Sequence, residues 1–159
     1  MVILGVDPGT ATTGYGLIKT SEKGLKCLDY GSIKTEPSFT MAKRLKKINN
    51  ELNKLIKKYQ PKAMAVENVY FFKNLKTALP VSQAKGVILL TAAKKNLPVY
   101  EFTPLQIKMA MTGYGKAEKI QIQKVVQTLL NLKEMPRPDD AADALGAAIC
   151  CLRGLDSLS

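Results

Sequence analysis

Two acidic residues each follow directly on a short apolar run. A carboxylate at the end of a buried strand can bind a cation or act in catalysis. Residues 2–6 are almost continuously apolar and end on Asp7, and residues 63–66 are apolar and end on Glu67. An acid is costly to bury without partners, so an acid at the end of a buried strand and beside the turn at Pro8-Gly9 indicates a site for a cation or a phosphate. The simpler interpretation of Asp7, taken alone, is that it caps the turn.

Three more acids follow Pro138. Asp140 and Asp143 are three residues apart and would share one face of a helix. Asp139 and Asp143, four apart, would also share a face, so spacing does not choose between Asp139 and Asp140. An N-cap role explains Asp139, and the helix dipole favours acids in a first turn. These interpretations do not explain Asp143, which stands among Ala and Leu residues.

Crowded carboxylates repel one another and take up protons, and a divalent cation removes that repulsion. Ligands that are all oxygen suit Mg²⁺ or Mn²⁺ and not Zn²⁺. Two such ions about 4 Å apart activate a water and stabilise the leaving oxygen in phosphodiester hydrolysis. The sequence contains no His, which excludes Ser-His and Cys-His nucleophile pairs and any histidine metal site.

The expected strands would bring these acids together. Residues 2–6, 14–19 and 25–33 read as three strands with short links, and such strands pair as antiparallel neighbours. Residues 63–66 and 97–102 read as two further strands, which right-handed crossovers place parallel to the first. The prediction is an α/β fold with a five-stranded mixed sheet and helices on both faces. Sites in such sheets form at the carboxyl ends of central strands, where neighbours about 5 Å apart would let Asp7 and Glu67 share one ion.

Helices are expected between and after these strands. Apolar residues at three- and four-residue steps predict a helix over residues 39–59, with Ser38 as its N-cap, and its lysine-rich face is either solvated or in contact with nucleic acid. Residues 77–96 predict a second helix, whose small residues would permit a subunit interface. Thr103 with Pro104 and Gln106 predicts a helix start. The last helices are expected over residues 117–130 and from Asp139 or Asp140 to about Arg153, ended by Gly154.

The composition restricts the partners. The net charge of +11 points to a polyanion, most often nucleic acid. No stretch approaches the ~20 apolar residues of a membrane span, and no signal peptide is visible, so we expect no membrane partner. The three cysteines, odd in number and two of them adjacent, favour a reducing compartment, and we expect a cytoplasmic protein.

Several segments together resemble RuvC-type Holliday junction resolvases. They are Gly5-Val6-Asp7-Pro8-Gly9 with Thr13-Gly14-Tyr15-Gly16, Val66-Glu67-Asn68-Val69, Gln83-Ala84-Lys85-Gly86-Val87, Gly113-Tyr114-Gly115-Lys116-Ala117-Glu118-Lys119 and Asp140-Ala141-Ala142-Asp143-Ala144-Leu145. The resemblance covers nearly the whole chain, in order. It implies a ribonuclease H-like fold, here as one domain over residues 1–159, and a homodimer that cuts two opposed strands of a four-way DNA junction with Mg²⁺, in recombination and repair. Partner proteins in branch migration are implied by the family as well.

The resemblance also implies roles for single residues. The family's four acids fall on Asp7, Glu67, Asp140 and Asp143, which selects Asp140 over Asp139. Its two important lysines fall on Lys108 and Lys119. Its base-stacking aromatic falls on Tyr70, with Phe71 and Phe72 as further candidates; the alternative is a hydrophobic cluster that closes the sheet.

The leading hypothesis is therefore a Mg²⁺-dependent, structure-specific endonuclease, an enzyme in which Mn²⁺ would substitute. Lys119 is expected to contact phosphate or to steady the charge of the transition state; the alternative is a solvated lysine. Tyr70 or a neighbour would insert at the junction centre, where stacking contributes ~1–3 kcal/mol per base. The lysines expected to contact backbone phosphates are Lys73, Lys76, Lys85, Lys108 and Lys116.

Two other functions compete with this hypothesis. The segment Asp7-Pro8-Gly9-Thr10 resembles the first phosphate loop of actin-like ATPases and sugar kinases, which would make the protein an ATP-dependent phosphotransferase. That class has two such domains, and this chain shows no second phosphate loop. A non-catalytic DNA-binding module would explain the charge but would leave the acids idle.

Overall fold

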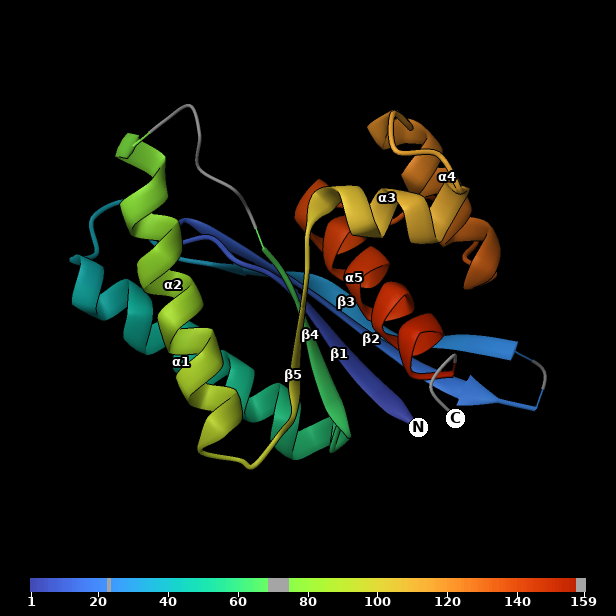
Figure 1. Ribbon diagram of the computed structural model, residues 1–159. Coiled ribbons are helices and arrows are strands. Elements are labelled where there is room, and N and C mark those ends of the chain that lie inside the picture. Colours follow the sequence, from blue (N-terminus) through green and yellow to red (C-terminus); the bar gives the residue numbers. More distant parts are fainter. Residues whose placement is uncertain (23, 69–74, 157–159) are drawn as a thin grey trace.

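The computed structural model describes residues 1–22, 24–68 and 75–156. Within these ranges, five strands form one sheet and five helices lie on its two sides (Figure 1). The strands are β1 (Val2–Asp7), β2 (Thr12–Ser21), β3 (Gly24–Lys34), β4 (Ala63–Glu67) and β5 (Val99–Phe102). The helices are α1 (Met41–Tyr59), α2 (Leu75–Ala93), α3 (Pro104–Thr112), α4 (Lys119–Leu129) and α5 (Asp139–Asp156). None of the helices in the described ranges combines the length and apolarity that crossing a bilayer requires.

The sheet has the strand order β3-β2-β1-β4-β5. β2 pairs antiparallel with both β1 and β3, whereas β4 pairs parallel with β1 and β5 parallel with β4. The predicted mixed sheet, with three antiparallel strands followed by two parallel ones, is therefore confirmed. β1 lies at its centre, and its carboxyl end and that of β4 meet at one edge.

The sheet separates two hydrophobic cores because successive strand residues face opposite ways. Ile3 in β1 packs with residues of α3, α4 and α5, whereas Leu4 and Val6 pack with residues of α1 and α2. Figure 1 shows α1 and α2 on one side of the sheet and α5, with α3 and α4 beyond it, on the other. Helices thus cover both faces, as the sequence predicts.

Small residues let α5 lie directly on the sheet. A Cβ added to Gly5 would lie 1.9 Å from the carbonyl oxygen of Ala144, and one added to Gly14 would lie 2.0 Å from that of Asp140. Ala141, Ala144 and Ala148 on α5 are fully buried. The close approach brings the first two turns of α5, with their acids, to the ends of β1 and β2.

Some helix boundaries differ from prediction. Thr40, not Ser38, is the N-cap of α1, and its hydroxyl accepts a hydrogen bond from the backbone N–H of Lys43. Gly154 does not end α5, which continues to Asp156. The start of α3 is confirmed, because the Thr103 hydroxyl and the Gln106 side chain form the predicted reciprocal cap.

Candidate metal centre and the adjoining cleft

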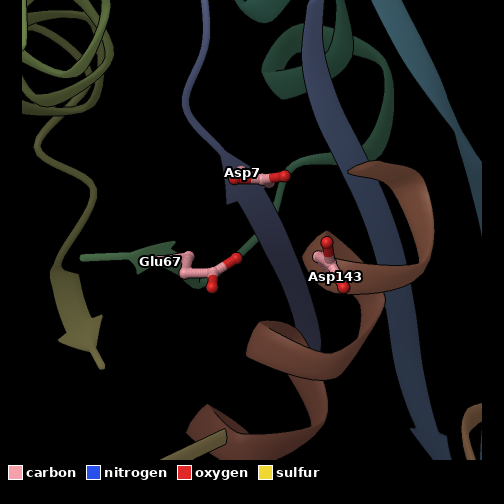
Figure 2. A group of neighbouring side chains, drawn as sticks. All are labelled: Asp7, Glu67 and Asp143. Atoms are coloured by element: carbon pink, nitrogen blue, oxygen red, sulfur yellow. The ribbon is translucent and has the colours of Figure 1, made fainter. Parts of the chain in front are cut away.

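Three carboxyl groups from distant parts of the chain converge where β1 and β4 end. Among the described residues, Asp7, Glu67 and Asp143 each offer one oxygen, and these oxygens all lie within 4.8 Å of one another. Figure 2 shows Asp7 on β1, Glu67 on β4 and Asp143 on α5 gathered around one space. The side chains are half-buried, so they are partly shielded from water and still reachable from solvent.

The sheet register explains why the first two acids meet. Val6 pairs with Val66 in the parallel ladder of β1 and β4, so the next residues, Asp7 and Glu67, end neighbouring strands. Asp7 also stands opposite Gly14 of β2. Because Gly14 has no side chain, α5 approaches there and Asp143 completes the cluster.

Burial and mutual repulsion raise the pKa of all three acids. Burial, followed by the charges of Glu67, Asp143 and Asp140, raises the pKa of Asp7 from 3.8 to about 8. Burial and the charge of Asp143 raise the pKa of Glu67 from 4.5 to about 7. Burial also raises the pKa of Asp143, although nearby Lys119 opposes the shift.

A hard divalent cation fits this donor set. All the donors are carboxylate oxygens, which suit Mg²⁺ or Mn²⁺. They are also close enough to coordinate one ion together. A cation would compete with the protons that the raised pKa values of Asp7 and Glu67 favour near neutral pH. The residues therefore fit the ion that the sequence predicts, while the choice of metal stays a prediction.

The two candidates for the fourth acid lie in different places. Asp140 is half-buried, and its charge raises the pKa of both Asp7 and Glu67, yet its oxygens are not part of the 4.8 Å cluster. Asp139 is exposed, and its carboxylate pairs with Lys119 and accepts a hydrogen bond from Gln123. The metal-binding role predicted for Asp140 stays a prediction, and Asp139 has partners that spacing did not indicate.

A cleft of about 200 Å³ opens beside the carboxylates. Lys119 stands at this cleft, with its Nζ 3.2 Å from Asp143 Oδ2. Burial acts to lower the pKa of Lys119, but Asp143 and Asp139 outweigh it, so the pKa lies above its ordinary value and the side chain is a cation. Lys108 from α3 lines the same cleft. The full lining is Glu67, Pro104, Ile107, Lys108, Lys119, Ile122 and Asp143.

Three of the other predicted DNA contacts, Lys76, Lys85 and Lys116, lie within the described residues. The Lys85 ammonium donates hydrogen bonds to Glu101 and to Asn68 Oδ1, the latter at 3.0 Å, so in this structure it ties α2 to the ends of β4 and β5. Lys76 and Lys116 are exposed on the surface. The predicted contacts at Tyr70, Phe71, Phe72 and Lys73 lie outside the described residues.

Hydroxyl groups brace the turn that follows Asp7. Buried Thr13 donates a hydrogen bond to the carbonyl oxygen of Gly9 at 2.6 Å, and Thr35 donates one to that of Thr10 at 2.6 Å. Arg44 of α1 in turn donates to the Thr35 hydroxyl. Sequence reasoning missed these positioning residues, because no local pattern links Thr35 or Arg44 to the turn.

Comparison with known proteins gives the family. The family model described as crossover junction endodeoxyribonuclease RuvC matches residues 3–151. The crossover junction endodeoxyribonuclease RuvC of Desulforamulus reducens is 55% identical over 150 residues, which is 94% of this chain and 92% of that protein. The chain belongs to the RuvC family. The family predicted from the sequence motifs is thereby confirmed.

Solved structures from the RuvC family agree with this fold. The Thermus thermophilus RuvC structure superimposes with a TM-score of 0.92 at 32% identity, covering 99% of this chain and 96% of that one. The same protein in complex with a Holliday junction substrate superimposes with a TM-score of 0.90 at 29% identity, with the same coverage. The predicted ribonuclease H-like architecture of the sheet and its helices is thus confirmed.

Proposed function

We propose that this protein is a Holliday junction resolvase, an endodeoxyribonuclease that makes paired, symmetric nicks in four-way DNA junctions during recombination and repair. Membership of the RuvC family supports the reaction, and the solved RuvC complex with a junction supports the substrate class. The observation that carries the proposal is the carboxylate cluster of Asp7, Glu67 and Asp143, which lies at a cleft that Lys108 and Lys119 also line.

The cluster would hold the metal, which we propose is Mg²⁺, with Mn²⁺ as a substitute. Asp7, Glu67 and Asp143 supply the oxygens that meet in this structure. Asp140 is proposed as the fourth ligand, because the family motif selects it. When bound, such ions polarise the scissile phosphate and lower the pKa of the attacking water. The chain contains no His, so the proposed reaction does not use a histidine base.

The cleft would place the DNA backbone against this cluster. Lys119 stands within hydrogen-bonding distance of Asp143, so a phosphate bound at the carboxylates would lie near its ammonium group, which would offset the charge that develops during hydrolysis. Lys108 would contact the same strand from α3. The roles proposed for Lys73, Lys76, Lys85, Lys116, Tyr70 and Phe71 follow the resemblance alone.

A homodimer is proposed because two symmetric cuts need two sites at a fixed separation. α2 carries an outward stripe of Leu79, Gln83, Gly86 and Leu90, in which Leu79 is 71% exposed and Leu90 57% exposed. An exposed apolar stripe with a glycine in its middle permits close packing of two helices about a two-fold axis.

The proposed compartment is the cytoplasm, and branch-migration proteins are proposed as partners. The cysteines Cys27, Cys150 and Cys151 are all free thiols, which suits a reducing compartment. Neither rival function is favoured. A phosphotransferase does not match the family, and a non-catalytic module leaves the half-buried carboxylates without a role.

Incubating the protein with a labelled four-way junction tests the proposal. Paired nicks are expected with Mg²⁺ and none without it, and no ATP hydrolysis is expected. The variant Asp7→Asn should still bind the junction, because it removes one negative charge near the DNA, but it should not cut it. Normal cutting by Asp7→Asn would refute the assignment of the metal site.

A further inference from the structure

Lys119 lies between two carboxylates that have different surroundings. Its Nζ is 3.2 Å from Asp143 Oδ2 and 3.3 Å from Asp139 Oδ2. Asp143 belongs to the carboxylate cluster, whereas Asp139 does not. The second oxygen of Asp139, Oδ1, accepts a hydrogen bond from Gln123 Nε2 at 3.0 Å. Each oxygen of Asp139 therefore has its own donor.

Both donors come from one face of α4. Lys119 and Gln123 are four residues apart, which places them one above the other on the helix. Gln123 is only 9% exposed, so its amide has a fixed position and depends on Asp139 as an acceptor. Asp139 is the first residue of α5, where the helix dipole also favours a carboxylate. The three side chains thus connect the start of α4 to the start of α5.

A cation in the cluster would compete with Lys119 for Asp143. Both are positive, and an oxygen that coordinates a divalent ion attracts a nearby ammonium group less strongly. A lysine held by Asp143 alone would be free to leave the cleft when the ion binds. Asp139 lies outside the cluster and is already oriented by Gln123, so it is able to keep its hold on Lys119.

We propose that Asp139 and Gln123 are positioning residues that hold Lys119 at the cleft while Asp143 is engaged by the metal. The inference rests on the proposed function, because it assumes that Lys119 acts on a phosphate bound there. It also gives the two neighbouring acids different roles, because Asp139 pairs with Lys119 whereas Asp140 is proposed as a metal ligand.

The first experiment follows the Lys119 ammonium group without any DNA. Its protons should exchange with water more slowly while carboxylates accept hydrogen bonds from them than in a freely solvated lysine, so the ¹⁵N NMR signal of the ammonium group would report the paired state. In the wild-type protein the signal is expected to persist after Mg²⁺ is added. In Asp139→Asn it is expected to disappear on addition of Mg²⁺, because Asn still accepts from Gln123 but carries no charge for Lys119. Loss of the wild-type signal with Mg²⁺, or its survival in the variant, would overturn the proposal.

The second experiment measures cleavage of a four-way junction in a single turnover. Asp139→Asn is expected to slow the cutting step by about tenfold, with junction affinity and Mg²⁺ dependence unchanged. Asp139→Glu should restore part of the rate. In a Lys119→Gln background, Asp139→Asn should have no further effect, because the two residues act through one group. Equal slowing in both backgrounds, or a weakened response to Mg²⁺, would contradict a positioning role.

Two more variants complete the design. Gln123→Met keeps the side-chain volume but removes the donor to Asp139, and it should slow cleavage by about threefold without weakening junction binding. A loss of thermal stability with no loss of rate would show instead that the contact only joins two helices. Glu51→Gln is the matched control, because it removes the exposed Glu51–Lys54 ion pair on α1 and should leave the rate unchanged.

These outcomes are distinct from a failure of the proposed function. A wild-type protein that does not cut the junction with Mg²⁺ would refute the resolvase. The NMR experiment would still decide whether Asp139 holds Lys119 when the ion binds.

Discussion

Asp7 makes the stability of the metal-free protein depend on pH. Its pKa rises from 3.8 to about 8 in the folded protein, first because of burial and then because of Glu67. Between those values the folded state binds more protons than the unfolded state does. The free energy of unfolding therefore falls as the pH rises through this window, and Glu67, with its pKa raised to about 7, acts in the same direction.

Stabilisation by Mg²⁺ should consequently increase with pH. At about pH 6 protons occupy Asp7 and Glu67 and compete with the ion, whereas at about pH 9 the carboxylates are free to bind it. We expect a larger rise in the melting temperature at the higher pH when Mg²⁺ is added, measured by thermal unfolding. An equal rise at both values would contradict the proposed ligands.

Replacing Asp7 by Asn should stabilise the metal-free protein at high pH. The variant removes a charge that is costly to bury and that lies close to other carboxylates. At about pH 9 the melting temperature should rise by several degrees, since 1 kcal/mol corresponds to roughly 2–4 °C in a protein of this size. Mg²⁺ should no longer raise the melting temperature of this variant. Near pH 6 and without Mg²⁺, the melting temperature of the variant should differ little from that of the wild type.

The sequence was informative about strand-end acids and less so about their neighbours. Asp7 and Glu67 were recognisable because each ends an apolar strand, and parallel pairing then placed them together. The partners of Asp139 were not recognisable, because its contacts with Lys119 and Gln123 depend on how α4 packs against α5. The same holds for Lys85, whose pairing with Glu101 depends on the docking of α2 beside β5.

At the scale of elements, α5 is the part whose position decides the geometry of the site. It contributes Asp143 and approaches the sheet through positions without side chains. Gly14 is the one of these positions that contacts an acidic residue, because an added Cβ would lie 2.0 Å from the backbone oxygen of Asp140 and 2.9 Å from its Cβ. Backbone cannot move aside as a flexible side chain can, so α5 itself would have to shift.

Gly14→Ala is therefore expected to weaken Mg²⁺ binding and cleavage by at least about tenfold, because sub-ångström errors in ligand position are costly. Calorimetric titration with Mg²⁺ and junction cleavage measure the two effects. Gly154→Ala is the control on the same helix, since nothing lies within 4 Å of its added Cβ. Unchanged Mg²⁺ affinity in Gly14→Ala would mean that the position of α5 on the sheet does not determine the geometry of the metal site.

Helix ends show where local signals succeed and where they do not. Thr103, Pro104 and Gln106 form a cap from their own side chains, so the start of α3 was predictable. Ser38 and Thr40 are both suitable caps for α1, and local propensity does not choose between them. A glycine near the end of a helical pattern usually indicates where the helix ends, but α5 continues past Gly154 to Asp156. The assignment of residues 1–159 to one domain stays a prediction.

For the whole molecule, Gly86 on α2 tests the proposed dimer. Nothing lies within 4 Å of a Cβ added there, and leucine favours helix more than glycine by roughly 0.8 kcal/mol, so Gly86→Leu should fold at least as stably as the wild type. The larger side chain would block a close helix approach. We expect a monomer in sedimentation experiments, with single nicks replacing paired ones. Gly154→Leu, at another helical position with open space, should leave the assembly unchanged.

The net charge of +11 predicts that junction binding weakens steeply with salt. Each lysine that contacts phosphate should contribute about one unit to the slope of log affinity against log salt concentration. Lys108→Gln and Lys116→Gln are therefore each expected to reduce the slope by about one, measured by fluorescence anisotropy. Lys54→Gln, whose ammonium already pairs with Glu51, is the control. An unchanged slope in both Lys108→Gln and Lys116→Gln would place the DNA on another face.

The parallel pairing of β1 with β4 has a consequence for protein synthesis. Asp7 gains its neighbour Glu67 only after the crossover through α1 has been made, and Asp143 joins them only when α5 has been translated and has docked. A nascent chain that lacks α5 therefore lacks one of the three acids of the proposed metal site. An unfinished polypeptide emerging from the ribosome would be unable to cut the chromosome, so nuclease activity would be withheld until the chain is nearly complete.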